Sequence, residues 1–174
     1  MRASKIVTAA AATCALVLLP AASAMAAGAP AAAGERATTN STAPSEAGNP
    51  RSARAQEAEV CSDARQVGST AYIDRGGVHV ASVKQFYSAS CNENYGYLWV
   101  WDSYRDKVKS YDITVGVYSY DQDATVGKRS WEATHEQEFW SDPADTVADC
   151  TSAVGSLRQP GDPAAGSAST DKRC

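Results

Sequence analysis

The run from Tyr87 to Trp101 constrains the fold of this chain more than any other stretch, because it holds a cysteine, a polar turn and the densest group of large aromatic side chains. Successive side chains of a β-strand point to opposite faces, and residues 95 to 101 alternate in that way. One face would carry Tyr95, Tyr97, Trp99 and Trp101. Glycine, leucine and valine lie on the other face, so both faces are mainly apolar, which predicts a central strand.

The first 26 residues have the pattern of a secretory signal peptide. Arg2 and Lys5 precede a continuous apolar run from residue 6 to residue 22, and small residues follow up to Ala26. That order predicts cleavage after Ala26 and a secreted, extracellular protein. No later segment approaches the roughly 20 apolar residues that a transmembrane helix needs, so we expect no transmembrane segment.

The charge balance narrows the classes of partner. The formal net charge is −4, and loss of Arg2 and Lys5 with a signal peptide that contains no acid changes it to −6. A chain with this balance and without a basic cluster is a poor candidate for binding nucleic acid.

Four cysteines follow the predicted signal peptide, namely Cys61, Cys91, Cys150 and Cys174. An even number in an exported chain predicts two disulfides, with three possible pairings. Loop length does not choose among the pairings, because joining sequence neighbours closes two loops of similar length. No two cysteines have C-x-x-C spacing and no histidine lies beside them, so we expect neither a metal site nor another cofactor.

Composition divides the rest of the chain into three parts. Residues 27–59 are rich in alanine, proline, serine and threonine and contain no aromatic residue, so we expect a disordered leader. Residues 60–157 are long enough for one modest core and form the predicted β domain. Residues 158–174 contain two prolines and two glycines and predict a flexible tail, which Cys174 could pin.

The folded part has the turn spacing of an all-β protein. Residues 71–74 and 78–88 predict a hairpin around Gly76-Gly77, and residues 113–118 predict a further strand. The charged residues of 129–140 suit the edge of a sheet. Residues 141–157 are compatible with a capped helix or with a strand, and both remain open. We predict a small antiparallel sandwich or partly open barrel of five to six strands.

The aromatic stripe has two interpretations. Tyr95, Tyr97, Trp99 and Trp101 could form a platform for sugar rings or for another protein, with Trp131 and Trp140 as further aromatic candidates. The favoured alternative is that the stripe is core. Each ring buries about 150–250 Å², and a domain of this size can hardly leave four such rings uncovered.

Few residues suggest catalysis. His79 and His135 are the only histidines, and no second histidine completes a zinc-protease helix. The segment Asp121-Gln122-Asp123-Ala124-Thr125-Val126 matches the nucleophile motif of haloacid-dehalogenase-type phosphatases, but only about fifty residues follow it, too few for the required fold. As a calcium loop the same segment has Val126 where glycine is needed. We therefore expect a solvated turn there and no catalytic residue.

The chain resembles small secreted actinobacterial (Streptomyces-like) proteins of unknown function. The resemblance rests on Cys61, on Tyr87-Ser88 ahead of Cys91, and on the strand Tyr-Gly-Tyr-Leu-Trp-Val-Trp. It implies secretion and a compact disulfide-bonded β domain, and it implies no catalytic residue.

Three functions are compatible with these observations. The leading hypothesis is a non-enzymatic module that binds a cell-envelope glycan or another extracellular protein. The second is an inhibitor of a secreted hydrolase that uses residues 102–110 or 121–128 as its exposed loop. The third is a small hydrolase that uses His79 or His135.

Overall fold

The computed structural model describes residues 41–174, and the predicted signal peptide and residues 27–40 lie outside that range. The two helices are α1 (Ala53–Glu57) and α2 (Asp102–Arg105). The strands are β1 (Arg65–Arg75), β2 (Val78–Ser88), β3 (Glu93–Val100), β4 (Tyr111–Ser119), β5 (Ala124–Thr134), β6 (Glu138–Trp140), β7 (Thr151–Arg158) and β8 (Gly166–Ser169).

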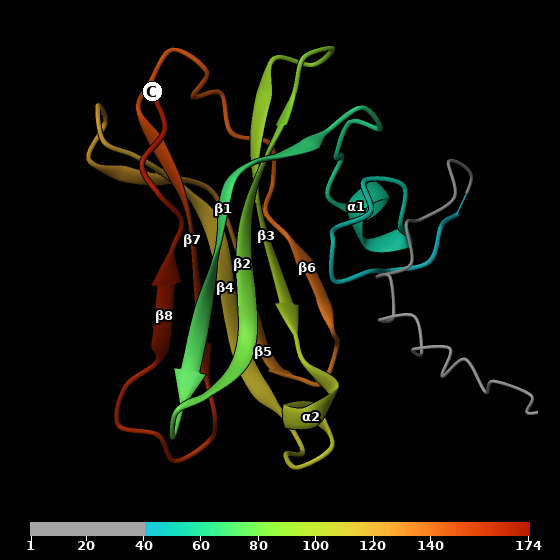
Figure 1. Cartoon of the computed structure of the whole chain (residues 1–174), viewed down its shortest axis with the longest axis vertical. Helices are drawn as coiled ribbons and strands as arrows, with labels where there is room; N and C mark the ends of the chain where they lie inside the picture. Colours follow the sequence, from blue (N-terminus) through green and yellow to red (C-terminus); the bar gives the residue numbers. More distant parts are fainter. Residues whose placement is uncertain (1–40) are drawn as a thin grey trace, which may run out of the picture. The chain divides into compact units, whose positions relative to one another are not determined.

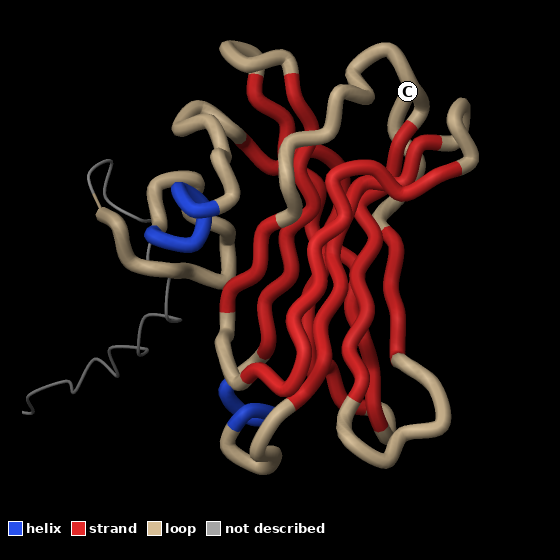
Figure 2. The backbone as a smooth tube through the Cα atoms, turned by 180° about the vertical axis from the view of Figure 1, so that it is seen from behind, coloured by secondary structure: helices blue, strands red, loops and turns tan. Residues whose placement is uncertain are grey.

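The strands form two four-stranded antiparallel sheets (Figures 1 and 2). One sheet has the order β1-β2-β3-β6, and the other has the order β5-β4-β7-β8. The all-β sandwich predicted from the sequence is confirmed, and the sheets do not close into a barrel. The two strands that contain residues 129–140, β5 and β6, both lie at sheet edges, as their charge predicts.

The hairpin between β1 and β2 is the one that the sequence predicts. Gly76 and Gly77 form its turn with φ of 58° and 78°, a region that residues with a Cβ rarely adopt. Trp99, in the predicted central strand, lies in β3 between β2 and β6. That strand is therefore internal to its sheet.

The main core lies between the sheets. Its largest apolar side chains come from both layers, and they include Ile73, Val83, Leu98, Ile113, Phe139 and Leu157. Glycine brings the layers together at Gly96, where an added Cβ would lie 2.5 Å from the carbonyl oxygen of Gly116 on the opposite sheet. A side chain at residue 96 would therefore force the two sheets apart.

The ordered domain begins earlier than the sequence predicts. Residues 41–59, assigned to a disordered leader, include α1, whose N-cap Ser52 accepts a hydrogen bond from the Ala55 amide, 3.0 Å away. Ala55 and Ala58 are almost completely buried. The prediction was wrong here because composition measures what a segment can bury against itself, whereas this segment is buried against the aromatic residues of a distant sheet.

The ordered domain also ends later than predicted. Residues 158–174, assigned to a flexible tail, contain β8, which pairs with β7. A disulfide joins Cys174 to Cys150. Residues 151–157 are strand rather than helix, which resolves the ambiguity of that segment.

Two further segments differ in detail from the sequence pattern. Residues 102–110, expected as a loop, contain the single turn of α2. Residues 129–140 are divided between β5 and β6, and Ala133, with φ of 49°, lies near the break. The division into β5 and β6, together with the additional strand β8, raises the number of strands above the predicted five or six. Within residues 41–174, no helix is long and apolar enough to cross a membrane.

Candidate functional site

The aromatic stripe of β3 lies on the outer face of its sheet, beneath residues 41–64, which we call the N-terminal cap. Tyr95 and Tyr97 have no exposed surface, and Trp99 is 9% exposed. They form a second core with Phe86, Trp140 and apolar residues of the cap. Figure 1 shows α1 beside this sheet, next to β6. The interpretation of the stripe as core therefore holds for these three residues, and they are not available as a binding face.

Polar anchors hold the cap on the aromatic residues. Lys84, on β2, is 3% exposed, and its Nζ lies 2.8 Å from Oε1 of Glu46 in the cap. The Tyr97 hydroxyl donates a hydrogen bond to the carbonyl oxygen of Ser45, 2.6 Å away. Gly48 has φ of 85°, and an added Cβ would lie 2.3 Å from the ring of Phe86. The cap is thus fitted to this one surface.

Burial under the cap changes the acid–base properties of two side chains. Desolvation raises the pKa of Tyr97 well above its ordinary value, with Glu138 the next contributor. Desolvation also raises the pKa of Glu138, although hydrogen bonds from Ser52 and Trp140 act in the opposite direction. The indole Nε1 of Trp140 donates to Glu138 Oε1 at 3.2 Å. The N-terminal cap covers both side chains, and this burial is the cause of both pKa shifts.

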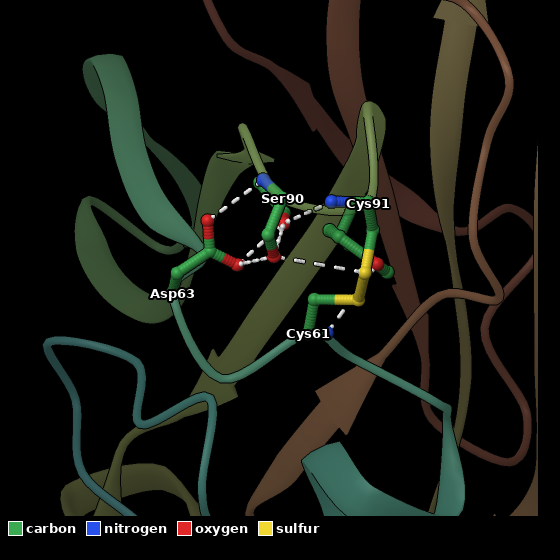
Figure 3. Close-up of a disulfide and its surroundings, with 6 residues drawn as sticks. Cys61, Asp63, Ser90 and Cys91 are labelled. Carbon is green, nitrogen blue, oxygen red and sulfur yellow. Dashed lines mark hydrogen bonds between the residues drawn. A yellow bond between two sulfur atoms is a disulfide. The ribbon is translucent and has the colours of Figure 1, made fainter.

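The Cys61–Cys91 disulfide joins the end of the cap to the β2–β3 turn (Figure 3). Beside it, Asp63 accepts hydrogen bonds from the hydroxyls of Ser88 and Ser90, both 2.6 Å away, and from the Ser90 amide. These bonds, that from Ser88 first, hold the pKa of Asp63 below its ordinary value. The cluster braces the disulfide, and it contains no histidine.

The remaining aromatic candidates lie at the margins of the two cores. Trp101 is half-buried against the second core. Trp131, on β5, is half-buried against Phe139, with ring centroids 4.9 Å apart, and the Arg129 guanidinium lies 5.1 Å from its ring centroid. The structure thus does not bring Trp131 together with the β3 stripe to form one platform.

The outer face of the other sheet has a different character. A groove of about 330 Å³ runs over β4 and β7, between side chains of β5 and β8. Its lining is mainly small or hydroxylated and contains one cation, and it comprises Thr114, Thr125, Lys128, Val154, Gly155, Ser156, Ser167, Ala168 and Ser169. The side chain of Thr125, which lines the groove, packs over Gly116, where an added Cβ would lie 2.5 Å from Thr125 Cγ2.

Several polar groups of the groove are available for a ligand. Within residues 41–174, the hydroxyls of Thr125, Ser156 and Ser167 and the ammonium of Lys128 make no hydrogen bond or ion pair with the protein. A hydroxyl can donate one hydrogen bond and accept two, so the groove offers both kinds of partner.

Two tyrosines extend the same face at the end of β4. The rings of Tyr118 and Tyr120 are perpendicular, with centroids 5.0 Å apart, and Tyr120 is 42% exposed. The Tyr120 hydroxyl lies 3.1 Å from Ser152 Oγ, and Lys172 Nζ lies 4.4 Å from the Tyr120 ring centroid. These contacts fix the ring while leaving part of it open to solvent.

The histidines lie in unrelated surroundings. His79 Nδ1 forms a hydrogen bond with the Asp74 carboxylate, and the ring stacks on Tyr72, with centroids 4.2 Å apart. His135 donates from Nε2 to the carbonyl oxygens of Arg105 and Val108, both 3.1 Å away. In the described part of the chain, no serine or cysteine side chain bonds to either imidazole.

Residues 121–123 of the acidic motif form the expected turn, whereas residues 124–126 already belong to β5. Asp121 accepts a hydrogen bond from the Cys150 amide, 2.7 Å away, and Asp123 accepts one from the Tyr118 hydroxyl. Among residues 41–174, no group of three or more histidine, cysteine, aspartate or glutamate residues could hold a metal ion.

Comparisons of the chain with protein-family models, with curated proteins and with solved structures found no match. The site must therefore be judged on its own geometry. Sequence reasoning missed the groove, because its serines and threonines come from four strands and have no common spacing. One available signal was Gly116 inside the alternating segment 113–118, since a glycine within a strand indicates a bulge or a close approach.

Proposed function

We propose that this protein is a secreted, non-enzymatic module that binds an extracellular or cell-envelope glycan on the outer face of the β5-β4-β7-β8 sheet. The observation that carries the proposal is the groove of about 330 Å³, in which the hydroxyls of Thr125, Ser156 and Ser167 have no partner among residues 41–174. The two disulfides are compatible with export, because such bonds persist in oxidising compartments.

A glycan suits the chemistry of this face. Sugar hydroxyls both donate and accept hydrogen bonds, as the hydroxyls of Thr125 and Ser156 do. The exposed part of the Tyr120 ring offers an apolar face for a sugar ring next to the groove. Lys128 adds a positive charge to the lining, which favours glycans that carry carboxylates or phosphates.

The test uses the secreted protein with insoluble cell-wall glycan and with soluble polysaccharides that differ in charge. Retention on the insoluble material and amide NMR shifts with the soluble chains measure binding. We expect the shifts to cluster on β4, β7 and β8. If no glycan binds, or if the shifts cluster elsewhere, the proposal is wrong.

A pair of matched variants tests whether the glycan binds in the groove. Ser156→Tyr fills the groove and should weaken binding at least tenfold, because Ser156 lines it. Ser103→Tyr makes the same change on α2, away from the groove, and should leave binding unchanged. Equal binding by both variants would contradict the proposed site.

A further inference from the structure

A second pocket lies away from the groove. It has a volume of about 190 Å³, and it is lined by residues of both sheets, of the 141–150 loop and of the C-terminal segment. Three of its polar side chains, Gln85, Asn94 and Thr151, are nearly fully buried. Gln85 Nε2 donates to Thr151 Oγ1 at 2.8 Å and to Asn94 Oδ1 at 3.2 Å. This network gives the pocket a fixed polar wall.

Arg173 is held beside this wall by several contacts. Its amide and carbonyl exchange hydrogen bonds with Thr151, at 2.8 and 2.6 Å, and the adjacent Cys174 is bonded to Cys150. Its aliphatic chain passes Gly68, where β1 has an irregular register and φ is 74°. An added Cβ at Gly68 would lie 3.3 Å from Arg173 Cδ.

The Arg173 guanidinium has no protein partner. Within residues 41–174 it makes no ion pair and no side-chain hydrogen bond. The main chain of Arg173 is fixed by Thr151 and by the neighbouring disulfide, while the charge of its guanidinium is unpaired among the described residues. Such a guanidinium is suited to bind a carboxylate through two parallel hydrogen bonds.

Asp149 supplies the opposite charge. Its Oδ2 accepts hydrogen bonds from Ser119 Oγ at 2.6 Å and from Gln122 Nε2 at 2.7 Å, and these bonds orient the carboxylate. Its Oδ1 accepts no hydrogen bond from the described residues. Asp149 and Arg173 line the same pocket, but they do not form an ion pair with each other.

We infer that this pocket binds a small zwitterion of the α-amino-acid type. The ligand carboxylate bonds to Arg173 and the ligand ammonium bonds to Asp149, while Val67 and Val147 contact the aliphatic part. A volume of about 190 Å³ equals that of roughly six water molecules, which is enough room for a small amino acid. The inference does not depend on glycan binding by the groove.

The test is an NMR titration of the whole secreted protein with L-alanine and L-serine, read at the Gln85 side-chain amide and the Arg173 Nε–H. We expect saturable shifts with a dissociation constant on the order of 1 mM, as for a small ligand held by two exposed ion pairs. N-acetyl-L-alanine lacks the ammonium and L-alaninamide lacks the carboxylate, so each should bind about tenfold more weakly.

Single variants test the contributions of Arg173 and Asp149 to ligand binding separately. Arg173→Gln and Asp149→Asn should each weaken L-alanine binding at least fivefold, and Arg173→Lys should restore part of the loss. Arg158→Gln changes an arginine outside the pocket and should have no effect. Non-saturating shifts for both amino acids, or equal binding of N-acetyl-L-alanine, would overturn the inference. Ser156→Tyr should leave this binding intact, so failure here and failure of the groove proposal are distinguishable.

Discussion

The outer face of the β1-β2-β3-β6 sheet carries Phe86, Tyr97 and Trp140 under the N-terminal cap, whereas the outer face of the β5-β4-β7-β8 sheet carries serines and threonines that stay exposed or half-buried. One sandwich thus has a covered aromatic face and an uncovered hydroxylated one. The difference teaches that the densest group of aromatic residues marks the surface that another part of the chain covers. The candidate ligand-binding face is the one whose residues attract less attention in the sequence.

The largest expected effect comes from removing the cap. A chain that begins at Val60, where the sequence pattern places the domain, would expose the rings of the second core. Each ring contributes several kcal/mol when covered, and the total stability of a domain is about 5–15 kcal/mol. We expect that the shortened chain shows no cooperative unfolding transition when circular dichroism is measured across a urea titration. A normal transition would show that the cap is dispensable.

A matched pair of substitutions compares the two faces directly. Trp140→Ala removes a ring that is 1% exposed and should lower the free energy of unfolding by about 3–5 kcal/mol. Tyr118→Ala, on the uncovered face, should lower it by less than about 1 kcal/mol. Chemical denaturation measures both values, and similar losses would contradict the contrast between the faces.

Breaking the Cys61–Cys91 bond should have the next largest effect. The double change Cys61→Ser with Cys91→Ser removes a link between residues 30 positions apart, at a cost of about 3–4 kcal/mol. Because this bond ties the cap, limited trypsin digestion should also cut at Arg51 or Arg54 first. The control is Cys150→Ser with Cys174→Ser, which should cost a similar amount and leave the cap resistant.

Glu46→Gln tests the polar anchor of the cap. It leaves the buried ammonium of Lys84 without its carboxylate partner and should cost about 1–3 kcal/mol. Glu57→Gln breaks an exposed ion pair with Arg54 and should cost less than about 0.5 kcal/mol. Equal costs in thermal unfolding would mean that the anchor is unimportant.

The smallest expected effect is a pH dependence with opposite signs at two acids. The folded-state pKa of Asp63 is below its ordinary value of 3.8, so its stabilisation is complete above that pH and disappears as the pH falls further. Asp63→Asn should therefore destabilise the protein at pH 7 and much less at pH 2.

Glu138 has a folded-state pKa above its ordinary value of 4.5, so its ionisation opposes folding as the pH rises through that value. Glu138→Gln should therefore gain stability relative to the natural protein at pH 7 but not at pH 3. Urea midpoints across this range measure both variants, and parallel pH profiles would contradict the assignment.

The sandwich could be predicted from the sequence because side chains alternate between the two faces of each strand and glycine occurs in the turns. Both are local properties of the sequence. The sequence leaves the disulfide pairing open because both bonds join segments whose proximity depends on the whole fold. It misplaces the start of the domain because Ala55 and Ala58 have no partner nearby in sequence.

The candidate sites could be predicted less well than the fold. Tyr95, Tyr97 and Trp99 attract attention as a row of rings, but the same size that makes a ring a good platform makes it costly to leave in water. Ser156 and Thr125 give no signal, because serine and threonine are common on any solvated strand. Asp149 and Arg173 line one pocket because the pairing of β8 with β7, the Thr151–Arg173 backbone bridge and the Cys150–Cys174 bond all return the chain end to β7.

Both disulfides fasten an end of the ordered chain to the sandwich, and neither crosses from one sheet to the other. In a reducing environment the contacts between the sheets would remain, while the N-terminal cap and the C-terminal segment would each lose one covalent tie. Reduction would therefore loosen the two ends of the ordered chain first.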